Sequence, residues 1–259
     1  MNGIILRQTR VRDNDAILDW LLDDDRVLTT AAFHIQGSRS FPNGLETFCI
    51  YEIECTERPD KGMVRLKSAY SSKRFDALLS DIPAFSCACA ALEAVSDVCP
   101  PDASVFNLFS SLLSTLAVME AASEYAPGAL AWFECYLLHQ LGALPNLEIC
   151  AGCAENLEAS PWYQQEVGFL CERCAKGQHN IEPFILNSVR RLRYQTLLTT
   201  MQNMTSRAMP ARQYKNIVAP VLRFLVAVLC DNSTVRRLKA HQYMAQAALD
   251  MPDLFLPTT

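Results

Sequence analysis

The stretch Cys150-Ala-Gly-Cys153, followed after seventeen residues by Cys171-Glu-Arg-Cys174, is the most specific local signal in this 259-residue sequence. Two thiolates three positions apart on a tight turn can bind one ion, and a second such turn completes a tetrahedral site. Because four cysteines leave no coordination position open, the pattern favours a structural zinc ion over a catalytic one. Between the pairs, Trp162-Tyr163 and Phe169-Leu170 predict two short strands, as in a zinc ribbon. The alternative is four buried or redox-active cysteines.

Helical periodicity surrounds this cysteine module on both sides. Before it, apolar residues recur at i, i+3, i+4 and i+7 from Val105 to Met119, and a second stripe predicts a helix over Ala129–Leu141 that Gly142 ends. After it, we expect helices near 185–201, 213–230 and 233–249. Pro220 must lie in a first turn or cause a kink.

The first eighty residues predict strands around one short helix. The expected strands are Ile4–Thr9, Arg26–Phe33, Leu45–Cys55 and Met63–Tyr70. The expected helix is Asp13–Leu22, with Asp13 or Asn14 as its N-cap and an apolar face that includes Ile17 and Leu21. Several short strands with turns between them indicate a small closed or nearly closed barrel, which ends near residues 76–84. The sequence therefore predicts an α+β protein.

Charge is distributed unevenly along the chain, whose formal net charge is −5. From Phe75 to Glu172 there is no Lys or Arg, whereas residues 181–259 hold ten basic and four acidic side chains. Any contact with nucleic-acid phosphates must therefore come from the first or the last eighty residues. The alternative is that acidic and basic segments neutralise each other across the fold.

Several classes of protein are not expected. The N-terminal residues contain no secretory apolar run, and polar residues interrupt the longest apolar stretch, Ala103 to Ala122. We therefore expect a cytoplasmic protein with no membrane association. The sequence contains no P-loop, nucleophile elbow, H-E-x-x-H or dinucleotide motif, so we expect no enzymatic activity.

Three stretches of the sequence resemble the bacterial RecO family of recombination mediators, over about residues 1–180. The first is Ile4-Ile5-Leu6-Arg7 running into Ile17-Leu18-Asp19-Trp20-Leu21-Leu22, and the second is Leu45-Glu46-Thr47-Phe48. The third runs from Tyr136 through Gly142-Ala143-Leu144-Pro145-Asn146-Leu147 into both cysteine pairs.

The resemblance implies an N-terminal OB-fold over residues 1–80, then an all-α domain over 81–259 with an inserted C4 zinc ribbon at about 148–180. It also implies a nucleoid-associated protein that binds single- and double-stranded DNA and anneals complementary strands in the RecF pathway. The implied partners are RecR, the acidic C-terminal tail of single-strand binding protein and, indirectly, RecA. The loop at 33–41 departs from the family, since Arg39 is its one permanent cation where relatives usually carry a Lys- and Arg-rich run.

Candidate nucleic-acid contacts lie at both ends of the chain. An OB barrel binds single strands by stacking bases on aromatic rings beside cations that follow the phosphates. On the barrel the candidates are Arg39, Phe41, Lys67, Lys73 and Arg74. In the last third they are Arg190, Arg191, Arg193, Arg236, Arg237 and Lys239, which suit phosphate or an acidic peptide. The alternatives are solvated strand ends and pairing with the acidic helices.

Three functions remain open from the sequence. The leading hypothesis is a non-enzymatic DNA-binding and annealing mediator. The second is a protein–protein adaptor in which the zinc and the barrel serve only as scaffold, as the acidic middle and the cation-poor loop favour. The third is a redox switch that works through the cysteine quartet, which one zinc ion per chain under reducing conditions would disfavour.

Overall fold

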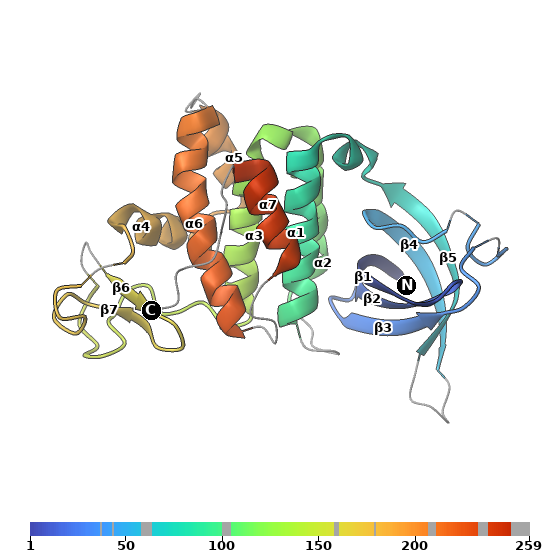
Figure 1. Ribbon diagram of the computed structural model, residues 1–259, viewed down its shortest axis with the longest axis horizontal. Coiled ribbons are helices and arrows are strands. Elements are labelled where there is room, and N and C mark those ends of the chain that lie inside the picture. The colour runs from blue at the N-terminus through green and yellow to red at the C-terminus, as the bar shows by residue number, and fades with distance from the viewer. Residues whose placement is uncertain are drawn as a thin grey trace.

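The computed structural model describes residues 1–36, 38–42, 44–57, 64–99, 105–157, 161–178, 180–206, 211–232 and 238–249. Three parts lie in a row: a β-barrel, a helical bundle and a small two-stranded ribbon at the end away from the barrel (Figure 1). One apolar core fills the barrel, and a larger core runs from the barrel wall through the bundle to the ribbon. The expected α+β class is confirmed.

Five strands close the N-terminal barrel in the order β1-β2-β3-β5-β4, which is the order of an OB-fold. They are β1 (Asn2–Arg12), β2 (Asp15–Leu22), β3 (Val27–Ala32), β4 (Cys49–Glu57) and β5 (Val64–Arg74). The pairs are antiparallel except β3 with β5, which runs parallel through Thr30–Val64 and Ala31–Arg65. The four expected strands are therefore confirmed, although β4 begins at Cys49 rather than at Leu45.

The helix expected over Asp13–Leu22 is wrong, because these residues form a turn and strand β2. Ala16, Leu18 and Trp20 point into the barrel as every second residue, and Trp20 is fully buried. The indole Nε1 of Trp20 donates to Thr30 Oγ1 on β3 at 2.9 Å. Over so short a run, the apolar residues Ile17, Leu18, Leu21 and Leu22 fit the spacing of a helix and of a strand equally well. The segment forms a strand because it pairs with β1 on one edge and with β3 on the other.

Helices build the rest of the chain around α3, whose residues are mostly buried. They are α1 (Ile82–Val98), α2 (Leu108–Ala121), α3 (Ala126–Gln140), α4 (Pro183–Tyr194), α5 (Leu197–Ser206), α6 (Ala211–Asn232) and α7 (Lys239–Leu249), with short 3-10 turns η1 (Asp76–Ser80) and η2 (Ser123–Tyr125). Gly142 follows α3 with φ +68°, as expected for a helix end. The helix expected near 185–201 is broken between Tyr194 and Leu197 into α4 and α5. No described helix is both long enough and apolar enough to cross a bilayer.

Helix α1 was not located by the sequence pattern, although it is the wall against which the barrel packs. Asp81 caps it by accepting from the Ala84 N–H at 2.9 Å, and Pro83 occupies its first turn. Its small residues are buried on several sides, so they leave no single apolar stripe to detect.

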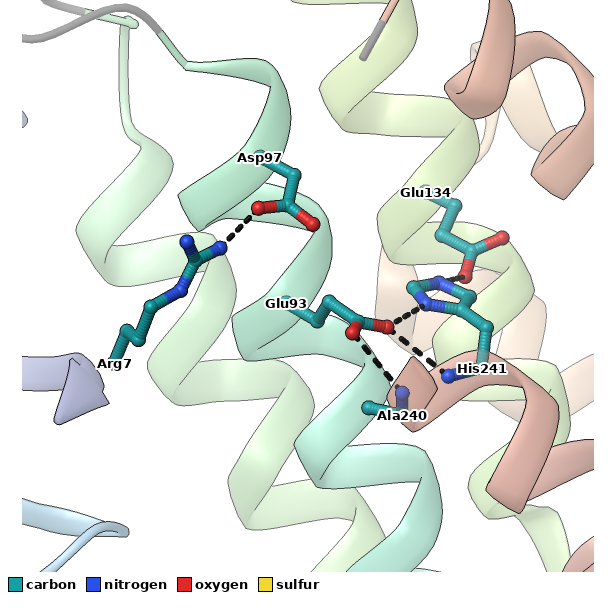
Figure 2. A network of polar contacts seen from close by, with 6 residues as sticks. All are labelled: Arg7, Glu93, Asp97, Glu134, Ala240 and His241. Carbon is teal, nitrogen blue, oxygen red and sulfur yellow. Dashed lines mark hydrogen bonds and ion pairs between the residues drawn. The ribbon is translucent and has the colours of Figure 1, made fainter. Parts of the chain in front are cut away.

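The barrel is fixed to the helices by polar and aromatic contacts. Arg7 of β1 pairs with Asp97 of α1 (Figure 2). The Asp25 carboxylate, in the β2–β3 turn, accepts from the backbone N–H groups of Asn107 and Phe109 at 2.8 and 2.9 Å and so caps α2. Phe48 packs edge-on against Phe85, with ring centroids 5.6 Å apart. The barrel and α1 therefore share one packed interface.

A buried charged network anchors α7 to α1 and α3. Figure 2 shows His241 between two carboxylates: Nδ1 lies 2.8 Å from Glu93 Oε2, and Nε2 lies 2.8 Å from Glu134 Oε1. Glu93 also accepts from the N–H groups of Ala240 and His241, which begin α7. Burial alone would lower the pKa of His241, but Glu134 and Glu93 outweigh it and raise that pKa to about 9. The imidazolium therefore holds three helices together.

Candidate metal centre and nucleic-acid surfaces

The four cysteines of the two C-x2-C pairs converge on one point beside the β6–β7 hairpin. Their sulfur atoms all lie within 4.8 Å of one another, and Cys153 Sγ is 3.6 Å from Cys171 Sγ. A tetrahedral zinc with Zn–S bonds of about 2.3 Å separates its sulfurs by about 3.8 Å. The arrangement of Cys150, Cys153, Cys171 and Cys174 can therefore hold a metal ion. The hairpin strands β6 (Trp162–Gln164) and β7 (Gly168–Leu170) confirm the two expected strands.

The backbone around Cys150 favours its thiolate. Cys150 Sγ accepts from the N–H groups of Gly152 at 3.3 Å and Cys171 at 3.2 Å. Burial raises the pKa of Cys150, yet these amide hydrogen bonds outweigh it and lower that pKa to about 6. A Cβ at Gly152 would lie 3.2 Å from Cys174 Sγ, so glycine avoids a tight contact with this sulfur. These features fit a tetrathiolate metal centre.

The ribbon is held against the helices by side chains outside the quartet. Tyr163 donates its hydroxyl to Asp231 Oδ2 of α6 at 2.7 Å, and its ring packs edge-on against Phe224. Arg190 of α4 donates to the Leu147 carbonyl through Nε and Nη2, at 3.0 and 2.6 Å, and pairs with Glu148 at 3.3 Å. The Arg190 guanidinium therefore holds the base of the ribbon. Its ion pair agrees with the alternative that the basic residues pair with the acidic segment.

On the barrel, the structure places most candidate cations beside carboxylates or rings. Lys67 pairs with Glu54 at 2.8 Å, and Arg74 pairs with Glu46 and Asp76. The Lys73 ammonium lies 4.7 Å from the centroid of the Phe75 ring. Arg39 is exposed and has no ionic partner among the described residues. Carboxylates therefore pair with Lys67 and Arg74, whereas Lys73 and Arg39 have no carboxylate partner among the described residues.

Phe41 does not have the role expected for it. Its side chain is 3% exposed and belongs to the core of the barrel. The loop before β4 lies beside β5, where the Ser40 carbonyl accepts from the Ala69 N–H at 3.1 Å, and the next residue, Phe41, packs into the core. Phe41 was expected to lie outside the core and to contact nucleic acid, and this is wrong for the observed conformation, because the ring is buried among the core residues of the barrel.

The helical candidates differ from one another in surroundings. Arg191 is exposed, and the Arg193 guanidinium carbon lies 5.1 Å from the ring centroid of Tyr194. Neither has a carboxylate partner among the described residues. Lys239 is exposed at the start of α7, beside the groove between barrel and helices. Arg236 and Arg237 lie outside the described residues.

Two exposed aromatic–arginine pairs were missed by the sequence reasoning. On the barrel, Phe33 is 38% exposed and the Arg65 guanidinium carbon lies 5.3 Å from its ring centroid. Only the parallel pairing of β3 with β5 brings these distant residues together, so no local signal could have shown it. The second pair, Arg193 with Tyr194, is adjacent in sequence, and the aromatic neighbour of an arginine cluster was a signal that was available.

The chain is an OB-fold protein: a closed five-stranded barrel is joined to a helical domain that carries a tetracysteine ribbon. The family model described as "Recombination protein O C terminal" matches residues 79–227, more than half of the chain. The chain belongs to the RecO family.

Curated relatives agree with this assignment. The DNA repair protein RecO of Anaeromyxobacter dehalogenans (strain 2CP-C) is 28% identical over 180 residues, which cover 68% of this chain and 70% of the relative. DNA repair protein RecO of Dehalococcoides mccartyi (strain ATCC BAA-2266 / KCTC 15142 / 195) is 28% identical over 195 residues, covering 74% and 76%. That of Heliobacterium modesticaldum (strain ATCC 51547 / Ice1) is 32% identical over 127 residues, covering 46% and 45%.

Proposed function

We propose that this chain is a non-enzymatic recombination mediator of the RecF pathway that binds single- and double-stranded DNA and anneals complementary strands. The observation that carries the proposal is the closed barrel of OB-fold order in a chain of the RecO family. OB barrels bind single strands through aromatic rings and cations, and Phe33 with Arg65 supplies such a pair at the β3–β5 seam. The metal that we propose for the cysteine quartet is zinc, in a structural role, because all four ligands are thiolates.

The proposed partners follow from the same family membership. They are RecR, the acidic C-terminal tail of single-strand binding protein, and RecA indirectly, whose loading onto single-stranded DNA the chain assists. The proposed location is the cytoplasm, in association with the nucleoid. Among the candidate residues, five suit contacts with phosphate or acidic peptide best, because no carboxylate pairs with them among the described residues: Arg39, Lys73, Arg191, Arg193 and Lys239.

Fluorescence anisotropy with a labelled single-stranded oligonucleotide at two salt concentrations tests the proposal. We expect binding at low salt that weakens steeply as salt rises, by about 0.7 in log–log slope for each phosphate neutralised on a single strand. A matched duplex should show a slope of about 0.9 per phosphate. Zinc-loaded, folded protein that binds neither oligonucleotide at low salt contradicts direct DNA binding.

A second candidate function is a zinc-stabilised protein–protein adaptor with little direct DNA binding. The ion pairs of Lys67 and Arg74 favour it, since they neutralise cations that DNA would otherwise use. For the adaptor, we expect binding to an acidic tail peptide without DNA affinity. The same titration therefore separates the two functions.

A further inference from the structure

We infer that the corner between α4 and α5 is a single-strand-binding site separate from the barrel, in which Tyr194 stacks on an unpaired base and Arg191 and Arg193 contact the flanking phosphates. The inference rests on the proposed function and adds to it a second surface, with its substrate class.

The corner presents an aromatic ring and an apolar side chain to solvent. Tyr194 is the last residue of α4 and is 72% exposed, and Leu198, in the first turn of α5, is 68% exposed. Among the described residues these are two of the most exposed large apolar side chains. The guanidinium of Arg193 lies against the Tyr194 ring at 5.1 Å. An exposed ring beside a guanidinium is the arrangement on which single-stranded bases stack.

Hydrogen bonds from α3 and within the turn fix the backbone of the corner. The indole Nε1 of Trp132, in α3, donates to the Gln195 carbonyl at 2.9 Å, and the Gln195 N–H donates to the Arg191 carbonyl at 3.1 Å. The Thr196 hydroxyl accepts from the Thr199 N–H at 3.2 Å and caps α5. These hydrogen bonds fix the backbone between α4 and α5 on both sides of the corner. The Tyr194 ring is therefore held at the surface, and the chain needs no further ordering when a ligand binds. Preorganised groups of this kind lose less entropy on binding.

The charges around the corner have no carboxylate partner within the described part of the chain. Arg191 is exposed, whereas Arg193 is half-buried, and its buried Nε has no hydrogen-bond partner. The described acids of α4 to α7 are Glu182 and Asp231, and Asp231 already accepts from Tyr163. Arg190, by contrast, is bonded to the Leu147 carbonyl and is not part of the site. Arg193 thus lies against the ring, and Arg191 precedes Tyr194 by three positions on the same helix, in the most basic third of the chain.

The position of the corner explains what a second site would do. Figure 1 shows α4 at the end of the molecule away from the barrel, beyond the helical bundle. A strand on Tyr194 would therefore be held apart from a strand on Phe33 and Arg65 of the barrel. Two separate single-strand contacts on one chain would let the protein hold both complementary strands during annealing.

The test compares Tyr194→Ala with Phe106→Ala, a matched control. Phe106 is 71% exposed and lies in the segment without Lys or Arg. In anisotropy titrations with a labelled single strand, we expect Tyr194→Ala to weaken binding about tenfold, the loss of one base–aromatic stack, and Tyr194→Trp to retain the affinity of the unaltered chain. Phe106→Ala should bind like the unaltered chain, and duplex affinity should change less than about twofold in both alanine variants, because paired bases are not free to stack.

The phosphate contacts proposed for Arg191 and Arg193 are tested by the salt dependence of binding. Arg191→Ala and Arg193→Ala should each lower the log–log salt slope for single strands by about 0.7. The annealing rate of complementary strands should fall in Tyr194→Ala and not in Phe106→Ala. Thermal unfolding and zinc content of each variant show that the fold is retained.

The outcomes separate this site from the proposed function. If the unaltered chain binds single strands and Tyr194→Ala binds them equally well, the corner is not a DNA site and DNA binding resides elsewhere. Equal losses in Tyr194→Ala and Phe106→Ala also overturn the inference, because they indicate a general surface effect. If the unaltered, zinc-loaded chain binds no DNA, the proposed function and this site fail together.

Discussion

At the residue scale, Gly152 of the first C-x2-C pair leaves room for a cysteine sulfur of the candidate metal site. Its missing side chain leaves the space into which Cys174 Sγ fits, 3.2 Å from where a Cβ would be. We expect Gly152→Ala to weaken zinc affinity about tenfold, in the range of changes just outside the ligand set. Competition with a chromophoric chelator measures it. Gly177→Ala is the control, since nothing lies within 4 Å of its Cβ position and any effect there comes from its φ of +75°. Equal effects in both variants would contradict the prediction, because they would show that the loss of affinity is not specific to the sulfur contact at Gly152.

His241 gives a pH-dependent prediction at the same scale. We expect His241→Gln to destabilise the protein by about 3–5 kcal/mol near neutral pH, because Glu93 and Glu134 lose the buried cation between them. The folded-state pKa is raised to about 9 from an unfolded value of 6.5. The stabilisation is therefore fully present below about pH 6.5 and is lost as pH rises through about 9.

Urea unfolding of the unaltered protein and of the His241→Gln variant, at neutral and alkaline pH, tests this prediction. A misfolded variant would give a misleading difference in unfolding free energy, so its far-ultraviolet circular dichroism is compared with that of the unaltered protein as the control. A difference that stays constant or grows between about pH 7 and about pH 10 would contradict a charged imidazole.

At the element scale, we expect the ribbon to depend on the proposed zinc, and α6 to depend on the ribbon. Without a metal, the two-stranded hairpin is too small to be stable alone. We expect chelation to increase hydrogen exchange in β6 and β7 strongly and in α6 moderately, through loss of the Tyr163–Asp231 bond and the Phe169–Phe224 packing. The barrel strands serve as the internal control and should keep their protection. Unchanged exchange in β6 and β7 would exclude a structural role for the metal.

Some of the helices and strands could be predicted from the sequence, and others could not. The C-x2-C spacing predicted the ribbon and its two strands because metal geometry acts locally on few residues. Strand β2 was mistaken for a helix because its edges are paired by β1 and β3, which a local pattern does not contain. Helix α1 was missed because packing on several faces removes the stripe that periodicity detects. Phe33 with Arg65, and His241 with Glu93, required the folded chain to bring them together.

At the scale of the whole molecule, the three parts form a row joined by specific contacts. Asp25 of the barrel caps α2, Arg7 of the barrel pairs with Asp97 of α1, and Arg190 of α4 holds the base of the ribbon. The aromatic–arginine pairs at Phe33 and Tyr194 lie on the barrel and on α4, which the bundle separates (Figure 1). This arrangement is the basis of the proposal that the chain holds two strands at once.

The annealing rate of complementary labelled strands, followed by energy transfer with zinc-loaded protein at low and high salt, tests the central claim most directly. We predict annealing well above the spontaneous rate at low salt, with a steep decline as salt rises, because phosphate contacts release counterions. A folded, zinc-loaded chain that leaves the spontaneous rate unchanged at low salt would contradict the account.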